Sequence, residues 1–274
     1  MASGRLFGVE SGAISAPQKH GMQQREFYEV QAGPETARPS DSSPIPDARD
    51  RGLASWLAQH VLRRRALLDA QARPLNIVEL GCGDGSLSIA LASLPQVQVL
   101  GVDIAKARIA RAAAAAARLT AVSFRVLDLD GELDALETGS ADVVVSVDVL
   151  EHVFDVFSFV GQIARIVRPQ GLVLLRVPNL AYIRHRLALA HGDLPITSSW
   201  FGPKNDLTAW RTKWGWDGGH LHNFTLPTLR ALLTEFGLKP LDWRDPGARF
   251  SPIRRLAPSL LAGNLAVLAE RTLR

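Results

Sequence analysis

Residues 78–91 read VELGCGDGSLSIAL, and this stretch decides the fold. It begins with the end of an apolar run of strand length, and it ends with apolar side chains at helical spacing. Between them, glycine occupies positions 81, 83 and 85. A strand-to-helix turn needs glycine where the backbone takes a positive φ angle or lies against a ligand, and the first N–H groups of the helix then point at that ligand. The stretch therefore predicts a binding loop for a nucleotide-like ligand.

Apolar runs of strand length alternate with helical stretches around this loop. A helix is expected over residues 51–71, where apolar residues recur at helical spacing. Strands are expected at residues 76–80, 97–102, 123–127, 142–147 and 172–177. Such alternation predicts an α/β fold with a doubly wound, parallel sheet.

The composition indicates a soluble globular protein. The chain has 274 residues and 47% hydrophobic residues, which is enough for a sizeable core, and it has no apolar run of the roughly 18 residues that a membrane span needs. No secretory signal is recognisable, so we expect a cytoplasmic protein. Cys82 is the only cysteine, which excludes an internal disulfide and a cysteine zinc cluster. The formal net charge of +4 favours acidic small molecules without requiring nucleic acid.

Three ligands compete for the glycine loop. A P-loop for ATP or GTP would need Gly-Lys-Ser/Thr, but residues 85–87 are Gly-Ser-Leu. A dinucleotide fingerprint would place a glycine three positions after Gly83, where Ser86 stands, so NAD is disfavoured but stays open. The third ligand is S-adenosylmethionine.

The ELGCGDG segment at residues 79–85 resembles motif I of the class I, Rossmann-like methyltransferases. Four later segments resemble that family in order: VLGVDIA, FRVLDLD, ADVVVSVDVLEHV and IARIVRPQGLVLLRVPN. Asp103 lies 20 positions after Gly83, where a carboxylate can accept both ribose hydroxyls. The resemblance implies a seven-stranded, mostly parallel sheet whose last strand is antiparallel. It also implies that S-adenosylmethionine is bound by Glu79, Gly81, Cys82, Gly83, Gly85, Asp103, Ile104, Asp128, Leu129 and Asp148.

The end of the fourth strand has two interpretations. The Asp148-x-x-Glu151-His152 stretch resembles the ubiquinone-biosynthesis O-methyltransferases, in which it is associated with a divalent metal. In the favoured interpretation Asp148 lines the sulfonium end of the pocket, and Glu151 and His152 begin the next helix. No metal ligands are then expected.

The chain after the fifth strand is too long for a simple connection, and we expect a substrate lid at about residues 180–225. This region resembles the methionine-biosynthesis MetW-like branch, with its type 11 and type 23 methyltransferase domains. The matching residues are Pro178, Asn179, Arg184, Arg186, His222, Phe224 and Thr225. Residues 200–216 hold four of the six tryptophans, which either pack a small subdomain or stack on a sugar or aromatic ring.

The remaining segments complete the predicted domain organisation. Residues 1–50 are rich in Pro, Ser and charge towards their end and are expected to form a mobile arm. Residues 51–274 form the methyltransferase domain. A helix at 226–236 and strands at 238–243 and 265–271 are expected to complete the sheet.

These features predict a methyltransferase that acts on a small-molecule or glycan-like acceptor, at oxygen. A hydroxyl acceptor needs a general base, and the candidates are His220, His222 and His152. No nucleic acid is expected, because the fourth strand lacks the Asn/Asp-Pro-Pro-aromatic motif of base methylation and no dense basic run is present. The alternative, from the MetW-like resemblance, is a cofactor-binding partner of a homoserine acyltransferase. A homodimer or a partner enzyme is compatible with both.

Overall fold

The computed structural model describes residues 24–29, 45–64, 73–192, 195, 220–244 and 256–273. Most of the predicted mobile arm lies outside the described residues. The tryptophan-rich segment at 200–216, most of the predicted lid and the basic segment at 245–255 also lie outside them.

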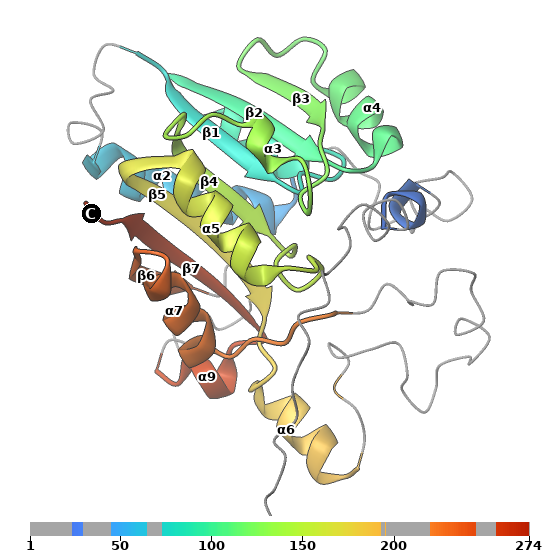
Figure 1. Cartoon of the computed structure of the whole chain (residues 1–274), viewed down its shortest axis with the longest axis vertical. Coiled ribbons are helices and arrows are strands. Elements are labelled where there is room, and N and C mark those ends of the chain that lie inside the picture. Colours follow the sequence, from blue (N-terminus) through green and yellow to red (C-terminus); the bar gives the residue numbers. More distant parts are fainter. Residues whose placement is uncertain are drawn as a thin grey trace, which may run out of the picture.

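A seven-stranded sheet with the order β3-β2-β1-β4-β5-β7-β6 forms the centre of the molecule (Figure 1). Strands β1 to β5 run parallel, and β7 runs antiparallel to both β5 and β6. The strands are β1 (Leu75–Leu80), β2 (Val97–Asp103), β3 (Val122–Val126), β4 (Ala141–Val147), β5 (Val167–Pro178), β6 (Leu238–Arg244) and β7 (Asn264–Arg271). The predicted α/β class and the antiparallel last strand are confirmed.

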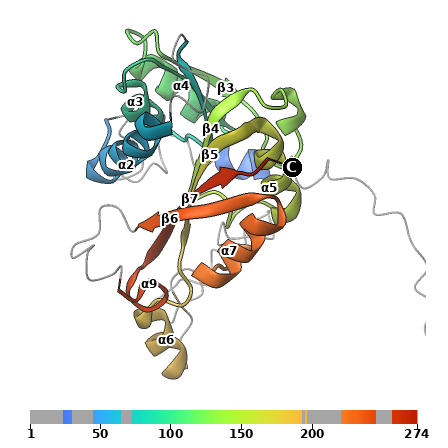
Figure 2. The same cartoon turned by 90° about the vertical axis from the view of Figure 1, so that its left-hand side faces the viewer.

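Helices cover both faces of this sheet (Figure 2). One core cluster joins α2 and α3 to the sheet, and a second joins α5 and α7 to the opposite face. Strand β4 is buried on both faces, as expected for the middle of a parallel sheet. The helices are α2 (Ala48–Arg64), α3 (Ser86–Ala92), α4 (Lys106–Ala115), α5 (Val156–Ile166), α6 (Ile183–Ala190), α7 (Leu226–Glu235) and α9 (Pro258–Leu261).

Helix α5 begins later than the sequence predicts. The carboxylate of Asp155 accepts a hydrogen bond from the N–H of Ser158 at 2.9 Å, which caps the helix and fixes its first residue as Val156. Glu151 and His152 therefore lie in the turn between β4 and α5, and the prediction that they begin the helix is wrong. Both side chains are thereby left at the carboxyl end of the sheet.

Part of the predicted arm is helical. Residues 24–29 form a short helix that lies beside the carboxyl ends of the parallel strands, coloured blue in Figure 1. Helix α2 begins at Ala48, where the carboxylate of Asp47 accepts the N–H of Asp50 at 2.8 Å. The described parts of the predicted arm are thus this short helix and the start of α2, and the mobility of the arm stays a prediction.

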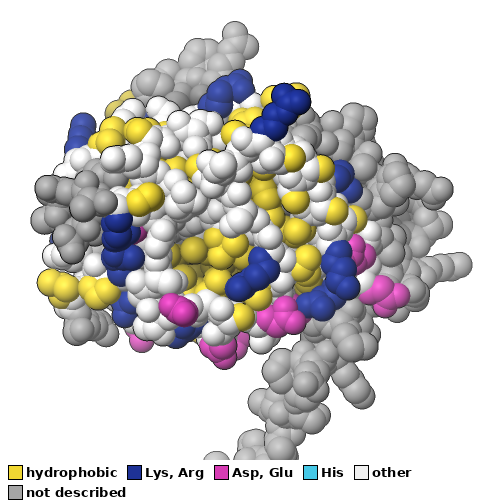
Figure 3. Space-filling model, turned by 90° about the horizontal axis from the view of Figure 1, so that it is seen from above, with side chains coloured by type: hydrophobic (Ala, Val, Ile, Leu, Met, Phe, Trp, Pro, Cys, Tyr) yellow, Lys and Arg dark blue, Asp and Glu magenta, His cyan; other side chains and the backbone are white. Residues whose placement is uncertain are grey.

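The described surface mixes side chains of different kinds. On the face seen from above, Lys and Arg are interspersed with Asp, Glu and hydrophobic side chains (Figure 3). Among the described helices, none is long and apolar enough to cross a bilayer. Helix α6 projects away from the sheet at the lower end of the molecule, and none of its residues is buried (Figures 1 and 2).

Candidate active site

The glycine loop turns from β1 into α3 with three left-handed residues. The φ angles of Gly81, Gly83 and Gly85 are 78°, 54° and 82°. A Cβ atom on Gly81 would lie 2.3 Å from Cγ2 of Val149, so a side chain there would also collide with the β4 to α5 turn. A Cβ on Gly83 would meet only the Arg108 guanidinium, at 3.5 Å, so glycine is needed at that position for its φ angle. The loop therefore brings bare backbone to the carboxyl edge of the sheet, as the sequence predicts.

Asp103 ends β2 and holds this loop in place. Its Oδ2 atom accepts the N–H of Gly83 at 2.9 Å, and its Oδ1 atom accepts the N–H of Ala105 at 3.0 Å. Each oxygen retains a lone pair for a further donor, which is what two ribose hydroxyls require. Burial raises the pKa of this carboxyl group. Ile104, the next residue, is buried behind it.

The end of β3 lies next to that of β2, because the N–H of Leu127 donates to the Asp103 carbonyl at 2.9 Å. Asp128 is buried there, and its carboxylate accepts the N–H of Asp130 at 3.0 Å. Burial raises the pKa of Asp128. The residues predicted to read the ribose and the adenine edge are therefore neighbours in space, with Leu129 beside them.

The side chains of Glu79 and Cys82 are buried within the protein. The carboxyl group of Glu79 is 3% exposed, accepts the hydroxyl of Ser88 on α3, and has a pKa raised by burial to about 8. It is mostly protonated at pH 7 and joins β1 to α3. Cys82 is buried in the turn, and burial raises the pKa of its thiol. The described contacts of these two side chains are with the protein, and their predicted cofactor contacts stay a prediction.

Asp148 stands at the end of β4 in a left-handed conformation, with φ 57°. Its N–H donates to the carbonyl of Arg176 at 2.9 Å, and the Arg176 guanidinium donates to its carboxylate. A second cation, Arg49 at the start of α2, lies 3.6 Å from the same carboxylate oxygen. A non-glycine residue held in this conformation by a tertiary contact is typical of a functional site.

Arg49 is also connected to the end of the glycine loop, through Asp50. It pairs with Asp50 at 3.3 Å, and Asp50 accepts the hydroxyl of Ser86, the first residue of α3, at 2.7 Å. This guanidinium therefore links Asp148 at the end of β4 to Asp50, which in turn contacts the first residue of α3. The sequence analysis missed this residue because arginines are common at the start of surface helices.

A cluster of Glu151, His152 and His220 forms at the lip of the site. The carbonyl of Glu151 accepts the N–H groups of Leu221 and His222 at 2.8 and 3.1 Å, which brings these residues to the turn after β4. The rings of His152 and His220 contact edge to face, with centroids 4.8 Å apart. One side-chain donor atom from each member of the cluster lies within 4.8 Å of the other two.

The carboxyl group of Glu151 is unusual within this cluster. It is 1% exposed, and neither oxygen has a hydrogen-bond partner among the other described residues. Burial, reinforced by the negative charge of Asp148, raises its pKa to about 8. Glu151 is therefore mostly a neutral acid at pH 7, and it can donate a hydrogen bond to an imidazole or to a ligand.

The structure separates the three donors of the ubiquinone-type stretch. The ubiquinone-type stretch would use Asp148 together with Glu151 and His152, but the carboxylate of Asp148 is bound by Arg176 and faces Arg49 as well. Two guanidinium groups compete with a divalent cation for that carboxylate. Asp148 is therefore separated from the other two donors, whereas Glu151 and His152 lie with His220 as a group of side chains that could hold a metal ion.

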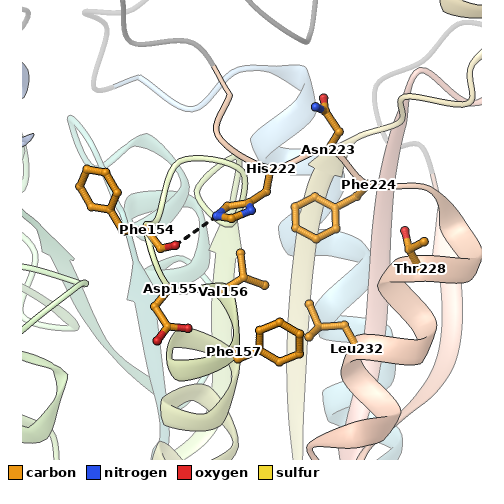
Figure 4. Close-up of a pocket in the computed structure, with 9 residues that line it drawn as sticks. All are labelled: Phe154, Asp155, Val156, Phe157, His222, Asn223, Phe224, Thr228 and Leu232. Carbon is orange, nitrogen blue, oxygen red and sulfur yellow. Dashed lines mark hydrogen bonds between the residues drawn. The ribbon is translucent and has the colours of Figure 1, made fainter. Parts of the chain in front are cut away.

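His222 lies apart from the cluster. Its Nε2 atom is 3.3 Å from the carbonyl oxygen of Phe154, and its ring lies between Phe154 and Phe224 (Figure 4). It lines a pocket of about 370 Å³ between the starts of α5 and α7. The pocket is formed by Phe154, Asp155, Val156, Phe157, His222, Asn223, Phe224, Thr228 and Leu232. Of the predicted catalytic residues, the structure thus joins His152 with His220 and places His222 in a neighbouring apolar pocket.

A family model described as a methyltransferase domain matches residues 51–242. The chain therefore belongs to the class I S-adenosylmethionine-dependent methyltransferases, the class that the sheet order and the glycine loop define. The family's cofactor is S-adenosylmethionine, as the sequence predicts. Membership of the MetW-like branch stays a prediction.

Curated relatives include ubiquinone biosynthesis O-methyltransferases. The protein of Rhizobium johnstonii is 36% identical over 112 residues, which cover 39% of this chain and 44% of that protein. The protein of Colwellia psychrerythraea is 31% identical over 205 residues, which cover 72% of this chain and 74% of that protein. Matches to the first four relatives span between 44% and 55% of their lengths.

Among solved structures, the fold is similar to that of 1,6-didemethyltoxoflavin-N1-methyltransferase from Burkholderia thailandensis. The TM-score is 0.58 and the identity 17%, with 97% of this chain and 94% of that chain covered. That protein was crystallised with bound S-adenosylhomocysteine. At this identity the likeness concerns the fold alone.

Proposed function

We propose that the protein transfers the methyl group of S-adenosylmethionine to a hydroxyl oxygen of a small-molecule or glycan-like acceptor. The observation that carries this proposal is the cluster of Glu151, His152 and His220 beside the glycine loop. In a sheet of this kind, the ligands meet at the carboxyl ends of the strands, so the sulfonium faces the end of β4. The cluster provides imidazole groups at that end.

The chemistry is an in-line displacement. The acceptor oxygen attacks the methyl carbon, the bond from that carbon to sulfur breaks, and S-adenosylhomocysteine leaves as a neutral thioether. Alignment of oxygen, carbon and sulfur supplies most of the acceleration, of the order of 7 to 11 kcal/mol for well-oriented groups. A hydroxyl also has to lose its proton, and a neutral imidazole can take it at physiological pH.

We assign the proton transfer to His220, with His152 and Glu151 as its supports. The edge-to-face contact with His152 fixes the plane of the His220 ring. Glu151 is buried beneath both and stays neutral until the pH approaches about 8. A neutral imidazole at His220 would take the hydroxyl proton as the methyl group transfers.

The relatives favour oxygen as the target atom, since several of them are named O-methyltransferases. The acceptor enters beside His220, whose ring contacts His152 in the turn after β4. Phenols, catechols and sugars are the acceptor classes to try first.

The experiment is a tritiated methyl-transfer assay on a panel of such acceptors, followed by variants assayed on the best one. His220→Gln is expected to lower turnover by a factor of about 10² to 10⁴ with the affinity for S-adenosylhomocysteine unchanged. The matched control is His191→Gln, because His191 is exposed at the end of α6. Full turnover by His220→Gln would contradict the assignment, and loss in His222→Gln alone would move the base to His222.

A further inference from the structure

The helix at residues 24–29 crosses the mouth of the cofactor site. At its start, the Gln24 amide donates to the carbonyl of His152 at 2.9 Å, at the end of β4. At its end, the Glu29 carboxylate accepts the N–H groups of Lys106 and Ala107, at 2.6 and 3.3 Å, at the start of α4. The helix thus runs from the end of β4 to the segment that follows β2, and Asp103 lies between these points.

Helical spacing fixes the side of the helix that faces the site. Gln24, Phe27 and Tyr28 stand at positions i, i+3 and i+4, which share one face. Gln24 is 5% exposed and Phe27 is 9% exposed, whereas Glu26 is exposed. Tyr28 is half-buried and lies one turn beyond Gln24 on the same face of the helix.

The surroundings of Tyr28 agree with that direction. Burial raises the pKa of its hydroxyl, and the negative charge of Asp103 acts in the same sense. Asp103 is the ribose-binding candidate, and Glu151 is part of the cluster at the lip. The Tyr28 ring packs edge to face against Phe27, with centroids 5.4 Å apart.

Glu29 anchors the helix at residues 24–29 by capping the N-terminus of α4. The N-cap position of α4 is Ala105, which has no side-chain oxygen to accept the first N–H groups of the helix. Glu29 supplies that cap from 77 positions earlier in the chain, and its negative charge is favourable at the positive end of the helix. Arg25 adds an ion pair with Glu132 at 3.2 Å, beyond β3.

We propose that Tyr28 contacts the bound cofactor and that the helix at 24–29 forms the outer wall of the cofactor site, with Glu29 as its anchor. The proposal rests on the cofactor being S-adenosylmethionine, but it is independent of the acceptor and of the base.

The expected results for variants follow from these roles. Tyr28→Ala is expected to weaken S-adenosylhomocysteine binding about 10- to 100-fold, as the loss of a large aromatic contact does. Tyr28→Phe should retain most of the affinity if the ring makes the contact. Glu29→Gln should increase the dissociation rate of S-adenosylhomocysteine by a smaller factor.

Fluorine NMR tests this in the intact protein, because the chain has only two tyrosines, Tyr28 and Tyr182. After labelling with 3-fluorotyrosine, the Tyr28→Phe variant assigns the two signals. Addition of S-adenosylhomocysteine is expected to shift the Tyr28 signal and to saturate at the same ratio as binding in calorimetry. Tyr182 begins α6 and packs against His185, so its signal serves as the internal reference.

Two results would overturn the proposal. One is a Tyr28 signal that does not move while calorimetry shows full occupancy by S-adenosylhomocysteine. The other is unchanged affinity in Tyr28→Ala, with Glu235→Gln on the exposed end of α7 as the neutral control for Glu29→Gln. If the cofactor binds and Tyr28 responds but no hydroxyl acceptor is methylated, the proposed function fails and the assignment of Tyr28 stands.

Discussion

The cofactor side and the acceptor side of this site are built in different ways. The expected cofactor residues lie at or just after the ends of β1, β2, β3 and β4, so each is positioned by its own strand. On the acceptor side, the carbonyl of Glu151 meets the N–H of Leu221 from a segment 70 positions further along the chain. The first kind of geometry is local and fixed by the sheet. The second depends on tertiary contacts, and it can change while the sheet stays the same.

The largest expected effect concerns the glycine loop. In Gly81→Ala the new methyl group would stand 2.3 Å from Val149, at a φ angle of +78°. Because backbone or the turn after β4 must move, we expect the affinity for S-adenosylhomocysteine to fall by more than about 100-fold. Isothermal calorimetry measures this directly.

The control for that variant is Gly139→Ala. Gly139 has a similar φ angle of +66°, but nothing lies within 4 Å of an added Cβ. The control should lose about 1 to 2 kcal/mol of stability and keep its affinity for the cofactor. Equal affinities for the cofactor in the two variants would mean that the loop accommodates the methyl group at position 81. The close approach to Val149 would then not affect binding.

A smaller effect is expected at Asp103. Asp103→Asn keeps the shape but removes the charge and one acceptor, so ribose binding should weaken by about 10- to 100-fold, as expected for one or two charge-assisted hydrogen bonds. Calorimetry with S-adenosylhomocysteine checks it, with Asp134→Asn as the exposed control. Wild-type affinity in Asp103→Asn would remove Asp103 from the cofactor side.

The pH dependence of stability tests the two buried acids. Glu79 and Glu151 have pKa values raised to about 8 from ordinary values of 4.5, so the folded state binds more protons than the unfolded state between these limits. The free energy of unfolding should therefore fall as the pH rises from about 4.5 to about 8, by up to about 1.4 kcal/mol per pH unit for each group. Urea denaturation at several pH values in this range measures that free energy. It should fall less steeply with rising pH in Glu79→Gln than in the wild-type protein. An identical slope in the two proteins would mean that Glu79 is ionised in the fold.

The smallest expected effect is that of metal removal. Because Arg176 and Arg49 face the carboxylate of Asp148, excess EDTA should leave turnover on a hydroxyl acceptor unchanged. The check is the tritium-transfer assay before and after dialysis against the chelator. Loss of turnover that Mg²⁺ restores would mean that a divalent metal takes part, with Glu151, His152 and His220 as its candidate ligands.

The sheet and the cofactor loop could be predicted from the sequence because both depend on local patterns. Strand and helix periods are local signals, and glycines at 81, 83 and 85 report backbone angles that no other residue adopts easily. The predicted strands agree with the structure apart from a few end residues; β5, for example, begins five residues earlier, at Val167. The helix boundary at Val156 was misplaced because the cap of Asp155 was not recognised.

The acceptor side was less predictable because its contacts join distant segments. Nothing in the local pattern at residues 24–29 indicates that Glu29 caps α4, since the missing cap belongs to Ala105. Arg176 carried a readable signal, a charged residue inside the apolar run LVLLRVP, which implies a buried partner. The pairing of His220 with His152, and the separation of His222 from both, required the tertiary structure.

The most direct test of the account is a crystal structure of the protein with S-adenosylhomocysteine. The account predicts both ribose hydroxyls on the carboxylate of Asp103, and the sulfur atom directed towards the cluster of Glu151, His152 and His220. A bound cofactor whose sulfur points away from that cluster would contradict the central claim, because no imidazole of the cluster could then reach the hydroxyl that receives the methyl group.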